Sequence, residues 1–188
     1  IQSQLRFIGL EAAVGSISQY RKAAIRSGKA PSLAALHRTL AEAELKAGRR
    51  HRALRELDLS SLHVEVTQDQ VALAQLHFAR SAAEGLLGDM FASLDHAKRA
   101  VAIASECGAT ALLQSALVNV AHCQIVLGLH RDALQTFTRL DAANVPSRGR
   151  ELVVRGNQLY LATAIRDEAL AASIDSTFGP LAADQSFT

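Results

Sequence analysis

Hydrophobic and polar positions recur along the chain with a period of forty residues. When the sequence is written in rows of forty from Pro31, three rows align without gaps, and leucines and glycines fall in shared columns. These columns contain Leu33, Leu73 and Leu113; Gly48, Gly88 and Gly128; and Leu54, Leu94 and Leu134. Small residues recur in the same way, at Ala41, Ser81 and Ala121 and at Ala53, Ser93 and Ala133. A fixed period of this length indicates a repeat architecture in which each unit is one supersecondary element.

Each unit predicts two helices joined at a glycine corner. Alanine and leucine dominate and favour helix, whereas β-branched and aromatic residues are scarce. Glycine readily adopts the left-handed backbone that closes a helix. The expected helices span 32–47 and 50–62, 68–87 and 90–107, 110–127 and 130–143, and 148–163 and 166–177. Asp89 is expected to cap the helix after Gly88, and Thr67 with Gln70 to form a capping box at the start of the second unit.

The helices together predict an all-α fold, a right-handed α-solenoid of about nine helices in antiparallel pairs. Small residues in the shared columns would let the helices of a pair approach closely, and leucines would fill the seam between pairs. The predicted segments are an N-terminal helix at 1–30 (a half-repeat or cap), repeats at 31–70, 71–110 and 111–147, an imperfect fourth repeat or cap at 148–179, and a disordered tail at 180–188.

The corner between paired helices resembles that of the tetratricopeptide repeat (TPR), in which a glycine, a short turn and then an alanine mark the second helix. The matching residues are Gly48 with Ala53, Gly128 with Ala133 and, as a variant, Gly88 with Ser93; Phe137, and Gly156 and Asn157 with Tyr160, match further family positions. The resemblance covers about residues 31–177, although the period is 40 here and 34 in the standard family. Longer repeats of this kind are similar to those of large bacterial regulators of the MalT type and of some eukaryotic assembly subunits.

This resemblance implies that the first helix of each pair lines a concave face that binds a peptide, a helix or a whole protein. Counting back from the turn glycines places on this face Arg38, Glu42, Leu45 and Lys46, then Gln75, Phe78, Ala82 and Leu86, then Val118, Asn119, His122 and Ile125. The face grades from charged to apolar, which suits an amphipathic helix or an extended peptide with one or two hydrophobic anchors. Phe78 and Val118 are the expected anchors. Alternatively, another helix of the chain covers these apolar residues.

Overall charge and cysteine content narrow the choice of compartment and partner. The formal charge of +2 gives no reason to expect direct binding of nucleic acid or of an acidic membrane. Cys107 and Cys123 are too few for a disulfide framework, so an intracellular, cytoplasmic location is expected. The most apolar run, 109–129, contains Gln114 and Gln124 among other polar residues, which argues against a membrane span.

The chain contains little that points to catalysis. It lacks the common motifs for phosphate loops, dinucleotides, zinc proteases and redox cysteines, so no enzyme activity, cofactor or metal is expected. His37 and His77 occupy equivalent positions, but Leu117 stands third, which favours packing residues over metal ligands. A basic run contains Arg49, Arg50, His51, Arg52 and Arg55. It suits a phosphate-rich partner or, as we expect, a solvated turn.

The pattern as a whole predicts a protein–protein interaction scaffold whose concave face holds a partner peptide or helix. An alternative function is a TPR-like sensor segment of a larger transcriptional regulator, which would bind a small inducer and act on other domains of its own chain. The start at Ile1 and the truncated first pair motivate this alternative.

Overall fold

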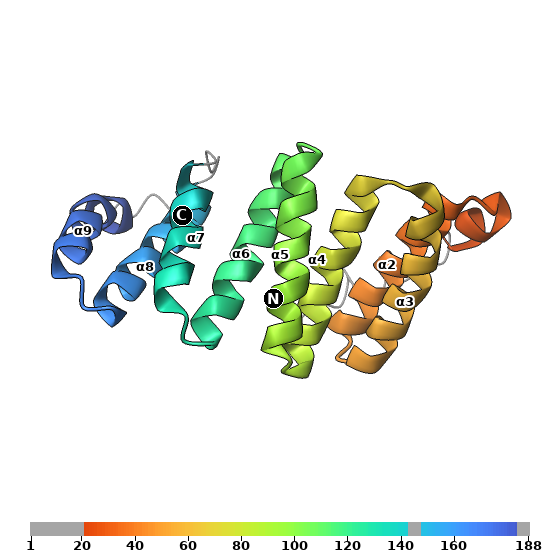
Figure 1. The fold of residues 1–188 in the computed structure, drawn as a ribbon, viewed down its shortest axis with the longest axis horizontal. Coiled ribbons are helices and arrows are strands. Elements are labelled where there is room, and N and C mark those ends of the chain that lie inside the picture. Colours follow the sequence, from red (N-terminus) through yellow and green to blue (C-terminus); the bar gives the residue numbers. More distant parts are fainter. Residues whose placement is uncertain (1–20, 143–147, 184–188) are drawn as a thin grey trace.

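The computed structural model describes residues 21–142 and 148–183 of the chain, with side chains at 21–140 and 153–176 (Figure 1). Every element in this part is helical, which confirms the predicted all-α fold. The helices are α2 (Ala30–Lys46), α3 (Arg50–Thr67), α4 (Gln70–Leu87), α5 (Met90–Glu106), α6 (Thr110–Val126), α7 (His130–Ala142), α8 (Arg148–Ala164) and α9 (Glu168–Ala183). Residues 21–27 are also helical, and the rest of the predicted N-terminal helix, 1–20, lies outside the described residues.

The helices stand side by side along the long axis of the molecule (Figure 1). Each helix packs against its neighbours in sequence, and the first helices α2, α4 and α6 also contact one another in order. The second helices α3, α5 and α7 make no such contacts with one another in the described part of the chain. The first helices therefore form the tighter, inner layer, and the second helices form the outer layer. The handedness of the array remains a prediction.

The predicted corner glycines are equivalent in the structure. Gly48, Gly88 and Gly128 have φ values of +74°, +95° and +73°, each between the two helices of a pair. Left-handed residues in fact recur every twenty residues, because three more lie between the pairs: Gly28 (φ +60°), Gln68 (φ +54°) and Gly108 (φ +68°). The residues equivalent to Gln68 are glycines, Gly28 and Gly108. Gln68 has a Cβ atom, so the left-handed backbone conformation is unfavourable for it.

We expect Gln68→Gly to raise the free energy of unfolding by about 1 kcal/mol, because it relieves the strain of a left-handed residue with a Cβ atom. The substitution also removes a long hydrogen bond, 3.3 Å, from the Gln68 side chain to the Glu65 carbonyl. Gln68→Ala is the matched control, since it removes that bond and keeps the Cβ. Urea unfolding measures both variants, and a glycine variant no more stable than the alanine variant would show that the backbone at position 68 is not strained.

The shared columns of small residues lie between the helices of a pair, as predicted. Ala41 and Ala53 belong to one buried cluster and Ala121 and Ala133 to another, and all four side chains are fully buried. In the middle pair, serines replace the alanines: Ser93 Oγ donates to the Ser81 carbonyl at 2.8 Å. The hydroxyls therefore keep their hydrogen bonds in a seam that has room only for small side chains.

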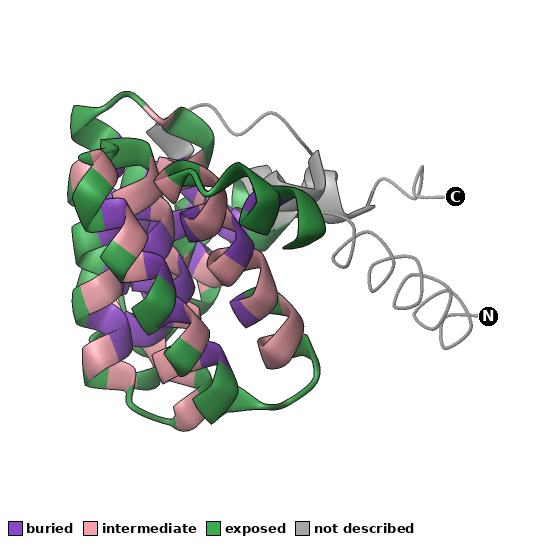
Figure 2. Cartoon of the chain, turned by 90° about the vertical axis from the view of Figure 1, so that its right-hand side faces the viewer, coloured by how far each residue is buried: buried purple, intermediate pink, exposed green. Residues whose placement is uncertain are grey.

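The buried apolar residues form two clusters. Viewed along the array, the buried positions lie mainly in its interior (Figure 2). One cluster lies on α2, α3 and α4 around Leu57, and the other extends from α5 to α8 around Leu140. Polar contacts between α4 and α5 separate them: the two serines above and a pair of histidines, His77 and His96. The junction between the clusters therefore carries these hydrogen bonds in addition to the apolar contact of Phe78 with the second cluster.

Two predicted boundaries are wrong. The helix expected at 50–62 continues to Thr67, because Val64 is buried and extends the apolar face of α3. Thr67 therefore bonds back to the Val64 carbonyl, and Asp69 caps α4 by accepting a hydrogen bond from the Ala72 amide at 3.0 Å. The tail expected from 180 is also placed too early, since α9 runs to Ala183. Pro180 lies within α9, where a proline removes one helical hydrogen bond while the turns on either side of it can still form. Residues 184–188 lie outside the described part of the chain.

Asp89 caps α5 as predicted, accepting a hydrogen bond from the Ala92 amide at 2.9 Å. The apolar run at 109–129 forms α6, which packs between the other helices. None of the described helices combines the length and apolar character needed to cross a membrane.

Candidate functional site

One face of each first helix remains accessible although the helix is packed on its other sides. On α6 the residues Leu117, Val120 and Gln124 are buried and face the outer helices α5 and α7. The exposed residues Val118 and His122, four positions apart, lie on the opposite face. This exposed face therefore points away from the second helices, on the inner side of the array.

We call this surface the inner stripe. It consists of nine residues in three rows of the forty-residue register: Arg38, Phe78 and Val118; Glu42, Ala82 and His122; and Lys46, Leu86 and Val126. Each row crosses α2, α4 and α6, whose axes run beside one another because these helices are in contact. Residues at the ends of the stripe on one helix are eight positions apart, which corresponds to roughly 12 Å along the helix.

The inner stripe changes from charged to apolar across the array. On α2 it carries two cations and one anion, and none of these three side chains forms an ion pair with any residue that the structure describes. On α4 and α6 it carries Leu86, Val118 and Val126, whose exposed fractions of 47%, 39% and 52% are large for apolar residues of this size. The predicted gradient is therefore present on the accessible face.

The residues expected on the concave face differ in how far they are accessible. Glu42, Lys46, Leu86, Val118 and His122 are exposed, whereas Arg38, Gln75, Phe78, Asn119 and Ile125 are partly buried. Phe78 and Ile125 pack against the α5–α8 core cluster. Gln75 and Asn119 are not among the nine residues of the inner stripe. Asn119 is the equivalent of Ala79, which is buried between helices.

Val126 lies outside the predicted set of groove residues, although the sequence carries a signal for it. Lys46, Leu86 and Val126 are forty residues apart, so the register that aligns the glycines also aligns these three. The predicted set contains the neighbouring Ile125 instead, whose side chain packs against the core.

Exposed apolar side chains also occur on α8, which makes no contact with α6 among the described residues. Val153 and Tyr160 of this helix are both exposed. The Tyr160 ring meets the His130 ring edge-on, with 6.4 Å between the ring centroids.

The histidines predicted as packing residues each contact the second helix of their own pair. His37 Nδ1 lies 2.8 Å from a Glu56 carboxylate oxygen, and its ring stacks on His63. His77 Nδ1 lies 3.0 Å from His96 Nδ1, a contact in which one ring donates and the other accepts. The pKa of His77 is lowered to about 4, mainly by burial and next by the neighbouring His96 ring. Within the described ranges, no three His, Cys, Asp or Glu side chains are grouped so that they could hold a metal ion.

The basic run lies at the exposed corner between α2 and α3. Arg49 donates to Glu44 and holds the pKa of that carboxyl below its usual range. The run's other charged side chains are exposed, as a solvated turn predicts.

Neither the family models nor the curated proteins contain a match to this chain. The TPR resemblance therefore remains a prediction, based on the glycine corners and on the small residues between paired helices. The inner stripe rests on the geometry of the described helices alone.

Proposed function

We propose that this chain is a binding module that holds an amphipathic helix of a partner protein against the inner stripe. The observation that carries the proposal is the set of exposed apolar side chains on two adjacent first helices, in register with each other and beside a charged helix. Exposed apolar surface of this kind, bordered by polar residues, is typical of protein-binding sites.

The spacing of the apolar residues fits a helical partner. Phe78 and Leu86 on α4, like Val118 and Val126 on α6, are eight residues and roughly 12 Å apart. An amphipathic helix presents apolar residues at i and i+7 or i+8, which are about 10–12 Å apart. Two anchors of a partner helix would therefore meet apolar side chains at both ends of the stripe.

The charges on α2 indicate what kind of partner residues lie against this helix. Arg38 and Lys46 outnumber Glu42, so this part of the stripe is net positive and favours acidic partner residues. The TPR resemblance supports the same surface, since arrays of that family bind partners on the face lined by the first helices. The partner expected from this charge pattern is an amphipathic helix with an acidic flank.

A helical peptide selected from a display library for binding to the full chain serves as the probe. We expect Leu86→Asp with Val126→Asp to weaken its binding by about 100-fold, because each substitution places a charge against an apolar anchor. Both side chains are exposed, so the helical circular dichroism should not change. Phe78 is a poorer choice, because it packs against the core and its substitution would also destabilise the fold.

Leu62→Asp with Val66→Asp is the matched control. These two residues are also exposed and apolar, but they lie on α3 in the outer layer. The selected peptide should bind this control as it binds the unaltered chain. Equal binding to the inner-stripe variant would remove the inner stripe as the site.

A further inference from the structure

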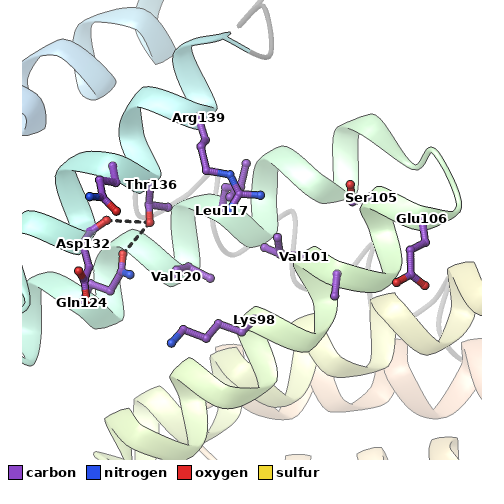
Figure 3. Close-up of a pocket in the computed structure, with 12 residues that line it drawn as sticks. Lys98, Val101, Ser105, Glu106, Leu117, Val120, Gln124, Asp132, Thr136 and Arg139 are labelled. Carbon is purple, nitrogen blue, oxygen red and sulfur yellow. Dashed lines mark hydrogen bonds between the residues drawn. The ribbon is translucent and has the colours of Figure 1, made fainter.

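A groove lies on the outer side of the array, between the second helices α5 and α7, with α6 as its floor (Figure 3). Its volume is about 620 Å³, within the range of about 300–1,000 Å³ that is typical of small-molecule sites. The floor is apolar, formed by Leu117 and Val120 together with Val101 on α5. Lys98 and Arg139 reach into it from the facing helices α5 and α7 (Figure 3).

The equivalent place one unit earlier, over α4, is occupied by a side chain of the protein itself. Arg80 lies there with a side chain only 20% exposed, and its guanidinium donates to the Asp58 carboxylate at 2.5 Å. Forty residues later, Val120 stands in place of Arg80 and Lys98 in place of Asp58. The later groove therefore lacks an equivalent of the Arg80 guanidinium, and the charge at the position of Asp58 is reversed.

The acidic residues of the earlier place are replaced as well. Gln124 is the equivalent of Glu84, and Gln135 is the equivalent of Asp95. Asp95 forms an i,i+4 ion pair with Arg99 within α5. Arg139, the equivalent of Arg99, has no ion pair among the residues that the structure describes. The groove thus has two cations in its lining, Lys98 and Arg139, and neither forms an ion pair with a residue that the structure describes.

A buried amide marks the floor of the groove. Gln124 is 6% exposed, and its side-chain oxygen accepts a hydrogen bond from the Thr136 hydroxyl at 2.8 Å. Its side-chain nitrogen has no protein partner in the described part of the chain. The amide nitrogen is therefore a donor on the floor of the groove that an acceptor of a bound molecule can meet.

We infer that this groove binds a small organic carboxylate with an apolar body. The carboxylate takes the place that the Arg80 head group fills one unit earlier, paired with Lys98 and accepting a hydrogen bond from the Gln124 amide. The apolar body lies on Leu117 and Val120. Asp132 and Glu106, both exposed, also line the groove and make it neutral overall, so the preference for an anion comes from the positions of Lys98 and Gln124. This inference does not depend on the inner stripe.

Phenylbutyrate, its amide and the corresponding amine test the inference on the full chain. The carboxylate should bind with a dissociation constant on the order of 1 mM and shift the methyl NMR signals of Leu117 and Val120. The amide and the amine should bind about tenfold more weakly, because they lack the charge-assisted bond to Lys98. Equal shifts with all three probes, or no shift with any of them, would overturn the inference.

Two variants sharpen the test. Val120→Arg with Lys98→Asp copies the arrangement of Arg80 and Asp58 and should abolish binding of the probe. Lys98→Asp alone changes only an exposed residue, so it keeps the fold and should reverse the preference, with the amine binding more tightly than the carboxylate. The variant Leu86→Asp with Val126→Asp should bind phenylbutyrate as the unaltered chain does. An unreversed preference in Lys98→Asp would show that Lys98 does not select the ligand.

Discussion

Leu57→Ala should lower the free energy of unfolding by about 3 kcal/mol and loosen one end of the array more than the other. Leu57 is fully buried at the centre of the cluster on α2, α3 and α4. Removal of a buried leucine side chain costs the transfer of its methyl groups and leaves a cavity, about 2–5 kcal/mol in total. In a repeat array each unit is stabilised mainly by its neighbours, so the loss should remain near the substituted unit.

Hydrogen exchange measured helix by helix checks this expectation. Amides of α2 and α3 should lose protection in Leu57→Ala, while those of α6 and α7 keep most of theirs. Leu140→Ala is the matched control, because Leu140 is equally buried but belongs to the cluster from α5 to α8. It should produce the reverse pattern. A uniform loss of protection in both variants would show that the polar junction between α4 and α5 does not divide the core.

The periodic part of the fold could be predicted from sequence because each signal there has one physical meaning. A glycine at the end of an apolar stretch, as at Gly48 and Gly88, allows the left-handed backbone that closes a helix. Small residues such as Ala41 and Ala121 are needed where two helices approach closely, and they are buried at those places. These constraints repeat in three units, so a boundary that is ambiguous in one unit can be assigned from the equivalent positions of the other two.

The rest of the fold could not be predicted because the signals there are weak or have competitors. Gln68 and Arg166 adopt a left-handed backbone conformation although neither is a glycine, the residue from which this conformation is usually predicted. The end of α3 therefore has no visible signal, and the predicted cap at Thr67 is wrong because Asp69 performs that role. Residue type alone does not decide between these two polar side chains, since both are good caps.

The residues of the inner stripe could be predicted only in part. Whether a side chain on a helix is accessible or packed depends on the neighbouring helices, which the sequence of that helix does not specify. Phe78 and Val118 share a row of the register, yet Phe78 leans into the core and Val118 is exposed. The outer groove was not predicted at all. The contact of Arg80 with Asp58 connects two helices across twenty-two positions, and without it the replacements at Val120 and Lys98 have no visible consequence.

Acid should weaken the fold through His77 and His96. The pKa values of both rings are lowered, mainly by burial and also by the nearby cations Arg80 and Arg99, while Asp95 acts in the opposite direction. The pKa of His77 is lowered to about 4. Well above pH 6.5, the ordinary pKa of histidine, both rings are neutral in the folded and the unfolded chain. As the pH falls from 6.5 to about 4, the unfolded chain binds protons that the folded chain excludes, so stability is lost across this window.

The loss should reach about 2 kcal/mol, less than the full pKa difference implies because both rings are partly exposed to solvent. His77→Leu with His96→Thr copies Leu117 and Thr136 of the next unit and removes both titrating rings. Urea unfolding at about pH 7 and about pH 4.5 should show a smaller loss of stability for this variant, while His122→Thr, an exposed control, keeps the full loss. Two protonated rings cannot share one hydrogen bond, so protonation of both breaks the contact of His77 with His96 between α4 and α5. If the double variant lost as much stability in acid as the unaltered chain, protonation of this junction would not be the cause.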